Sequence, residues 1–185
     1  MEVKGIAVST ITPFIQGQFG EKEYENWLWS LPPESKKIFE STIIEDDWYP
    51  VVDALVIPTR KICEIFYNGN TEGAKALGRF SADHSLKGIL KWLIQIRSPE
   101  SLLEKASDVM ETYYRPSELV ITESEKNSTV LRIIEFPDLD EILYIRMIGW
   151  IERALEICGC KKIKINMTAS LADGDDFTEF QITWE

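Results

Sequence analysis

Histidine and cysteine are scarce in this sequence of 185 residues, which contains one histidine and three cysteines. Cys158 and Cys160 are separated by a single glycine, a spacing that rarely meets disulfide geometry. A structural zinc site needs four ligands at recognised spacings, and the only further candidates, Cys63 and His84, are distant in sequence. We therefore predict no metal site, and we interpret the cysteines as reduced, mostly buried thiols of a cytoplasmic protein.

Basic clusters and long apolar runs are also missing. Asp and Glu number 31 against 20 Lys and Arg, which gives a net charge of −11 and a pI near 4.7. This charge repels nucleic acid and anionic membranes unless a basic patch overrides it, and Lys161, Lys162 and Lys164 form too short a patch. Residues 1–11 lack the features of a signal peptide, and no apolar stretch approaches a membrane-spanning length. The sequence predicts a cytoplasmic protein with no nucleic-acid partner and no membrane insertion.

Apolar residues are plentiful enough for one folded core, at 44% of the chain with 11% aromatic. No repeat or linker divides the sequence, so we interpret residues 1–185 as a single domain. Its first part, residues 1–116, is predicted to be helical, with Trp48-Tyr49-Pro50 as a break and a kink or division at Pro58. Ser98-Pro99-Glu100 is typical of a helix start, and the apolar face that follows consists of Leu102, Ala106, Val109 and Tyr113.

The second part, residues 117–185, changes character. Two β-rich runs separated by a polar stretch predict a hairpin, and residues 138–158 carry the clearest helical periodicity, which ends at Gly159. Two further strands follow, over residues 162–168 and toward Trp184. The expected fold is α+β: an N-terminal helical half followed by a four-stranded, mostly antiparallel ββαββ sheet backed by the long helix.

Several short motifs resemble a known family. The opening Lys4-Gly5-Ile6, followed by Phe14-Ile15, Phe19-Gly20-Glu21 and Trp27, is similar to the start of haem nitric oxide/oxygen binding (H-NOX) domains. The wider superfamily includes 4-vinyl reductase-like small-molecule binding domains and vesicle-tethering subunits. An uncharacterised bacterial family resembles the chain more closely, through the stretches Leu77–Ala82, Ser98-Pro99, Gly149-Trp150 and a last strand ending at Trp184.

The haem chemistry of H-NOX domains does not carry over with this resemblance. The family's proximal histidine lies on the helix before the sheet, and laying that helix on Ser98–Tyr114 places the ligand near Met110, on a helix without histidine. The family's Tyr-x-Ser-x-Arg motif, which holds the haem propionates, should fall near the second strand. This sequence reads Ile134-Glu135-Phe136-Pro137-Asp138 there, without tyrosine or serine. Since a methionine on an apolar helix face is more often core than ligand, we predict a haem-free domain without a cofactor.

Signals for catalysis are weak. His84 lies beside Asp83 and near Ser81 and Ser85, but the sequence has no Gly-x-Ser-x-Gly nucleophile elbow, and a lone histidine between helices is usually a cap or a surface residue. The acidic clusters Glu45–Asp47 and Asp173–Asp176 do not match a calcium-binding loop and are explained by turns. We predict no catalytic residues.

The six tryptophans favour binding. Trp27 and Trp29 cannot point the same way on one helix, so at least one of them is expected near the surface. Core packing explains most large indoles, whereas an exposed aromatic patch would mark an interface or the mouth of an apolar pocket.

These observations predict a non-enzymatic sensing or adaptor domain. It would bind a small apolar ligand in the cleft between helical half and sheet, or a protein partner, with a homodimer as one case. The predicted ligand-binding residues are Trp92, Met110, Tyr113, Trp150, His84 and Arg79. The alternative is a small-molecule enzyme of the vinyl-reductase-like type, which a convergence of Arg79, His84 and Arg132 in the cleft would favour.

Overall fold

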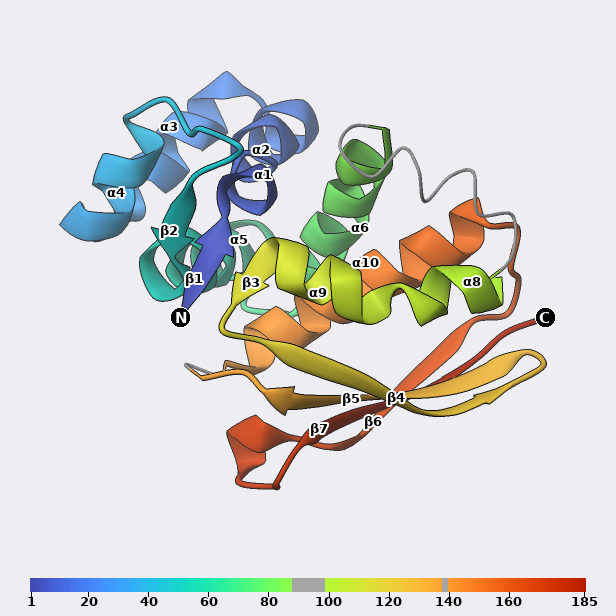
Figure 1. The fold of residues 1–185 in the computed structure, drawn as a ribbon. Helices are drawn as coiled ribbons and strands as arrows, with labels where there is room; N and C mark the ends of the chain where they lie inside the picture. The colour runs from blue at the N-terminus through green and yellow to red at the C-terminus, as the bar shows by residue number, and fades with distance from the viewer. Residues whose placement is uncertain (88–98, 138–139) are drawn as a thin grey trace.

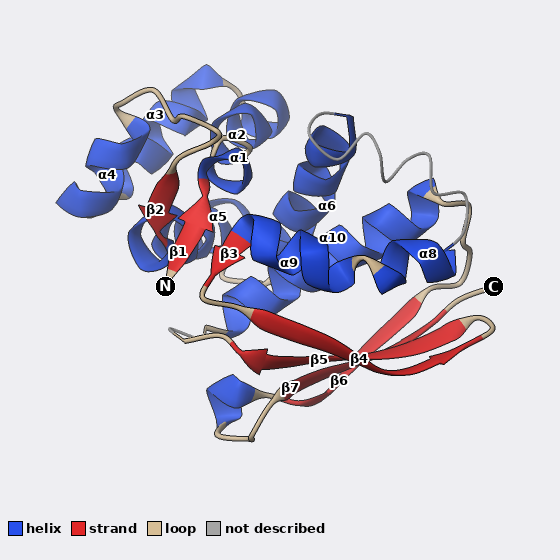
Figure 2. Ribbon diagram, viewed as in Figure 1, coloured by secondary structure: helices blue, strands red, loops and turns tan. Residues whose placement is uncertain are grey.

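The chain forms a helical part that lies over one face of an antiparallel sheet. The computed structural model describes residues 1–87, 99–137 and 140–185 (Figure 1). Helices α8, α9 and α10 lie on one side of the larger sheet, and a smaller sheet joins them to the N-terminal helices (Figure 2). The predicted α+β class, with its helical half and a four-stranded sheet backed by a long helix, is confirmed.

The larger sheet consists of β4 (Glu118–Glu125), β5 (Ser128–Glu135), β7 (Thr178–Thr183) and β6 (Lys164–Ala169), in that spatial order and antiparallel throughout. Alternate residues of β5, namely Thr129, Leu131 and Ile133, are buried, as the period of a strand with one covered face requires. Between β6 and β7 lies a short 3₁₀ helix, η2 (Leu171–Asp173). The covered face of this sheet forms the floor of the site described below.

Helix α10 (Glu141–Ile157) runs between the sheet and the rest of the helical part. The Asp140 carboxylate accepts a hydrogen bond from the backbone N–H of Ile142 at the helix start and pairs with Arg60 at 2.6 Å. After the helix, Gly159 has a φ of +93°, which only glycine adopts readily, so the predicted glycine stop is present.

Helix α6 (Glu72–Lys87) crosses α10 at very short range, because glycines face the opposite backbone. A Cβ atom on Gly78 would lie 2.0 Å from the carbonyl oxygen of Arg146, and one on Gly149 would lie 2.2 Å from that of Lys75. Neither position has room for a side chain. The crossing therefore fixes the position of α10 relative to the helical part.

The N-terminal part contains α1 (Gly5–Val8), α2 (Ile11–Phe19), α3 (Glu21–Ser30), α4 (Pro33–Phe39), the π-helical turn η1 (Val52–Val56) and α5 (Ile57–Phe66). Pro58 lies in the first turn of α5, so the expected division of this helical segment is present. Trp27 is fully buried and Trp29 is 74% exposed, as predicted for this pair.

Two sequence-based expectations need correction. Trp48-Tyr49-Pro50 is not merely a break but strand β2 (Trp48–Pro50), which pairs with β1 (Glu2–Lys4); β3 (Tyr114–Arg115) pairs with the other edge of β1. The helix predicted from Ser98 divides at Lys105 into α8 (Pro99–Glu104) and α9 (Ala106–Tyr113). Strands of two or three residues have no periodicity that a sequence pattern could reveal.

Candidate functional site

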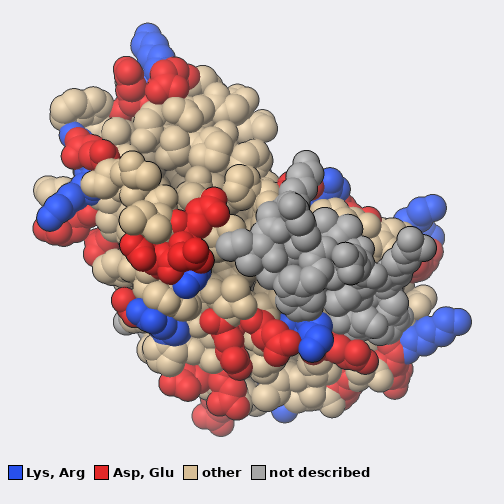
Figure 3. All heavy atoms as spheres, turned by 45° about the horizontal axis from the view of Figure 1, so that its top comes forward, with Lys and Arg blue, Asp and Glu red and all other residues tan. Residues whose placement is uncertain are grey.

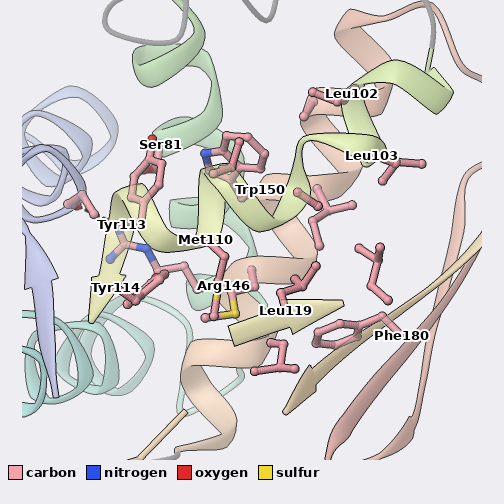
Figure 4. Close-up of a pocket in the computed structure, with 18 residues that line it drawn as sticks. Ser81, Leu102, Leu103, Met110, Tyr113, Tyr114, Leu119, Arg146, Trp150 and Phe180 are labelled. Carbon is pink, nitrogen blue, oxygen red and sulfur yellow. Dashed lines mark hydrogen bonds between the residues drawn. The ribbon is translucent and has the colours of Figure 1, made fainter. Parts of the chain in front are cut away.

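An apolar cavity lies between α8, α9, α10 and the covered face of the larger sheet (Figure 4). The cavity volume is about 90 Å³. On the same measure a single water molecule needs only about 10–15 Å³. The residues that line it are Ala7, Ser81, Leu102, Leu103, Ala106, Val109, Met110, Tyr113, Tyr114, Leu119, Leu131, Ile133, Arg146, Met147, Trp150, Ile151, Ala154 and Phe180.

Helices α8 and α9 supply one wall. The four residues predicted to form an apolar helix face, Leu102, Ala106, Val109 and Tyr113, all line the cavity. The apolar face is continuous across the turn at Lys105, because α8 and α9 run in the same general direction (Figure 1). The predicted apolar face therefore forms a wall of the cavity.

Helix α10 and the sheet supply the remaining walls. On α10 the lining residues are one turn apart: Arg146 and Met147, then Trp150 and Ile151, then Ala154. The sheet floor comes from three strands, through Leu119 of β4, Leu131 and Ile133 of β5, and Phe180 of β7. Since the described lining is almost entirely hydrocarbon, sulfur and aromatic rings, the site suits an apolar molecule.

One end of the cavity is polar. The guanidinium of Arg146 lies between the rings of Tyr113 and Tyr114, and Ser81 is at the same end (Figure 4). Arg146 is 3% exposed and donates from Nη2 to the carbonyl oxygen of Ala7 at 2.7 Å and to Thr10 Oγ1 at 3.3 Å. Burial raises the pKa of Tyr113 to about 12, so the phenol is neutral at pH 7.

The six predicted ligand-binding residues have different locations. Met110, Tyr113 and Trp150 line the cavity. Arg79 lies on the outer side of the α6–α10 crossing, 2.7 Å from Glu156 and 3.3 Å from Glu152, and His84 is exposed, with Nε2 3.9 Å from Glu45. Neither of these two is among the described residues that line the cavity, and Trp92 falls outside the described residues.

The convergence that would favour an enzyme is missing from the described structure. Arg132 pairs with Glu179 at 2.7 Å and stacks on Phe177, while Arg79 and His84 lie on other surfaces. Among residues 1–87, 99–137 and 140–185, no group of three or more His, Cys, Asp and Glu side chains is placed to hold a metal ion. Cys63, Cys158 and Cys160 form no disulfide.

Sequence reasoning missed Arg146 and the sheet floor. Arg146 was overlooked because its neighbours on α10 are nearly all apolar. The available signal is the apolar surroundings, since an arginine between Ile145 and Met147, with Trp150 and Ala154 one and two turns later, indicates a buried charge. The floor residues depend on the pairing of distant strands, which a local pattern does not determine.

Comparison with solved structures identifies the architecture. An H-NOX protein from S. oneidensis in the Fe(II) ligation state superposes with a TM-score of 0.77 over 98% of this chain and 96% of that chain, at 16% identity. The fold is that of H-NOX domains. H-NOX structures from K. algicida and T. tengcongensis give TM-scores of 0.73 and 0.72 over 98% of this chain and 96% and 97% of theirs, at 13% and 15% identity. No protein-family model and no curated protein matches the chain.

The donor groups around the cavity do not fit a haem. Helices α8 and α9 carry no histidine, and the one histidine of the chain, His84, is exposed and away from the cavity. The remaining candidates are the thioethers of Met110 and Met147 and the phenols of Tyr113 and Tyr114, whose pKa values burial raises. A thioether ligates haem iron together with a second, stronger ligand, and a tyrosine does so as phenolate. The described lining offers neither arrangement.

Proposed function

We propose that this protein is a haem-free, non-enzymatic sensor domain that binds a small apolar molecule in the cavity between α8, α9, α10 and the larger sheet. The single observation that carries this proposal is the cavity itself. It lies inside a fold whose solved examples include an H-NOX protein in the Fe(II)NO ligation state, yet its described lining is mostly apolar and contains no histidine or cysteine. Ligands of such pockets are held mainly by burial of their apolar surface.

The surface of the molecule supports a small ligand over a nucleic acid. On the face drawn in Figure 3, Lys and Arg side chains lie among more numerous Asp and Glu side chains, in keeping with the net charge of −11. None of the described helices is long and apolar enough to cross a membrane. Trp29 is the most exposed large apolar side chain described, and Lys36 covers one face of its ring, with Nζ 3.2 Å from the ring centroid. The cavity is therefore a stronger candidate for binding than this aromatic surface.

A neutral fluorescent probe tests the binding function. The wild-type protein should bind N-phenyl-1-naphthylamine saturably and one to one, with the rise in fluorescence that an apolar site produces. Ala154 lines the cavity and is 1% exposed, so Ala154→Leu should fill the space and abolish the signal. Ala76, which lies on α6 away from the cavity, provides the matched control, and Ala76→Leu should bind like the wild type. Equal binding by the two variants would exclude this cavity as the site.

An absorbance spectrum tests the haem-free state. Protein produced with a haem precursor supplied in excess should show no Soret band after purification. Added hemin should give only the broad spectrum of nonspecific association. A sharp Soret band at one haem per chain would contradict the proposal.

A further inference from the structure

Arg146 differs from every other arginine in the described part of the chain. Each of the others pairs with a carboxylate: Arg60 with Asp140, Arg79 with Glu152 and Glu156, Arg115 with Glu2, Arg132 with Glu179, and Arg153 with Asp83 and Glu156. Arg146 is the most deeply buried of them, at 3% exposure, and it takes part in none of the ion pairs of the described residues. Buried charges are ordinarily paired, because an uncompensated charge in a low-dielectric site is costly.

The hydrogen bonds of Arg146 are also incomplete. Nη2 donates to the Ala7 carbonyl and to Thr10 Oγ1, both of which are uncharged acceptors at the end of α1. Nη1 is buried and has no hydrogen-bond partner among residues 1–87, 99–137 and 140–185. A guanidinium presents its donors in a planar fork that matches the two oxygens of a carboxylate. One arm of the fork thus remains available at the polar end of the cavity.

The surroundings keep this cation charged and isolated. Burial lowers the pKa of Arg146 to about 10, which leaves the guanidinium protonated at neutral pH. None of the described lining residues is an aspartate or a glutamate. The nearby hydroxyl groups of Ser81, Tyr113 and Tyr114 are neutral at pH 7 and can donate hydrogen bonds to an anion. The polar end therefore supplies positive charge and donors, and the rest of the cavity supplies apolar surface.

We propose that the ligand of this cavity is a carboxylate amphiphile, whose head group pairs with Arg146 and whose apolar body lies against Leu102, Val109 and Leu131. This inference rests on the proposed function, since it names the class of ligand for the same cavity. A carboxylate would satisfy Nη1 and neutralise the buried charge.

The test compares octanoate with 1-octanol, which share the apolar chain and differ in the charge of the head group. Both compounds should displace N-phenyl-1-naphthylamine from the wild-type protein. In Arg146→Met, octanoate should bind about 10- to 100-fold more weakly, as expected for the loss of a charge-assisted hydrogen bond. The affinity for 1-octanol should change by less than about threefold, because its binding depends on the apolar walls. Arg132→Met, on the opposite face of the sheet, should leave both affinities unchanged.

A second measurement on the wild-type protein does not depend on the variant folding. Octanoate labelled with ¹³C at its carboxyl carbon should titrate in the complex with a pKa below that of the free acid, because a guanidinium stabilises the charged form. An unshifted carboxyl pKa in the complex would place the head group in solvent and overturn the assignment to Arg146.

The outcomes separate this inference from the proposed function. If Arg146→Met weakens the binding of octanoate and of 1-octanol equally, or weakens the binding of neither compound, the carboxylate proposal is wrong while the cavity remains a binding site. If the wild-type protein binds neither compound and does not bind the fluorescent probe, the proposed function itself fails.

Discussion

The two sides of helix α10 show opposite kinds of packing. Toward α6, backbone meets backbone, and the glycines at positions 78 and 149 leave no room for even a methyl group. Toward α9 and the sheet, Trp150, Ile151 and Ala154 line an unfilled cavity. A protein interior is normally close-packed, so a cavity costs stability unless the surrounding elements are held firmly. The comparison indicates that the tight crossing supports α10 while its other side remains available to a ligand.

The largest expected effect on stability comes from adding one methyl group on the side of α10 that faces α6. In Gly149→Ala the new Cβ would approach the carbonyl oxygen of Lys75 to 2.2 Å, and backbone must move to relieve the clash. We expect a loss of about 3 kcal/mol in the free energy of unfolding. Urea denaturation followed by far-UV circular dichroism measures it.

Gly17→Ala is the matched control for that experiment. Gly17 lies inside α2, and a Cβ there would meet nothing within 4 Å. Its substitution should stabilise the protein by about 0.5–1 kcal/mol, through the higher helix propensity of alanine. Similar effects of the two substitutions would show that the crossing of α6 and α10 is not tight.

Adding carbon atoms on the side of α10 that faces the cavity should change the free energy of unfolding in the opposite direction. Ala154→Leu extends into the cavity, and filling such a space is expected to raise the free energy of unfolding by about 1 kcal/mol. The same variant should lose the probe binding described above. A destabilisation as large as that of Gly149→Ala would mean that Ala154 is close-packed, and the contrast between the two sides of α10 would be wrong.

The smallest expected effect on stability comes from the ion pairs between Arg79 of α6 and Glu152 and Glu156 of α10. Arg79 and Glu156 are each about one-third exposed, at 33% and 32%, so Arg79→Met should cost no more than about 1 kcal/mol at pH 7. Hydrogen bonding to Arg79 lowers the pKa of Glu156, so this stabilisation exists above the ordinary glutamate pKa and is lost as the pH falls through the lowered value.

Urea denaturation across a pH series checks this sign. The difference between the wild type and Arg79→Met should disappear in acid. A difference that grows as the pH falls would contradict the assignment of the pair.

Several features of the site were predictable from sequence because they are local. The apolar face of α9 follows helical periodicity, and Met110, Tyr113 and Trp150, which the sequence predicts as ligand-binding residues, line the cavity. The strands of the larger sheet are long enough for their alternating pattern to predict them. The element order of the C-terminal part then followed from the turns between these segments.

Other features depend on contacts between distant segments. The small sheet joins β1 to β3 through the pairs Glu2–Arg115 and Val3–Tyr114, which no local pattern contains. His84 and Arg79 are predicted ligand-binding residues, but α6 directs them to other surfaces. Whether an apolar stripe packs against a neighbouring element or lines a cavity depends on the separation between elements, which the local sequence does not determine.

The most direct test of the central claim uses the four methionines of the chain as internal probes. Met110 and Met147 line the cavity, whereas Met1 and Met167 do not. In a spectrum of protein labelled with ¹³C at the methionine methyl groups, a titration with 1-octanol should shift the signals of Met110 and Met147 and leave those of Met1 and Met167 in place. Shifts confined to Met1 or Met167, or no shift at saturating 1-octanol, would contradict binding in this cavity.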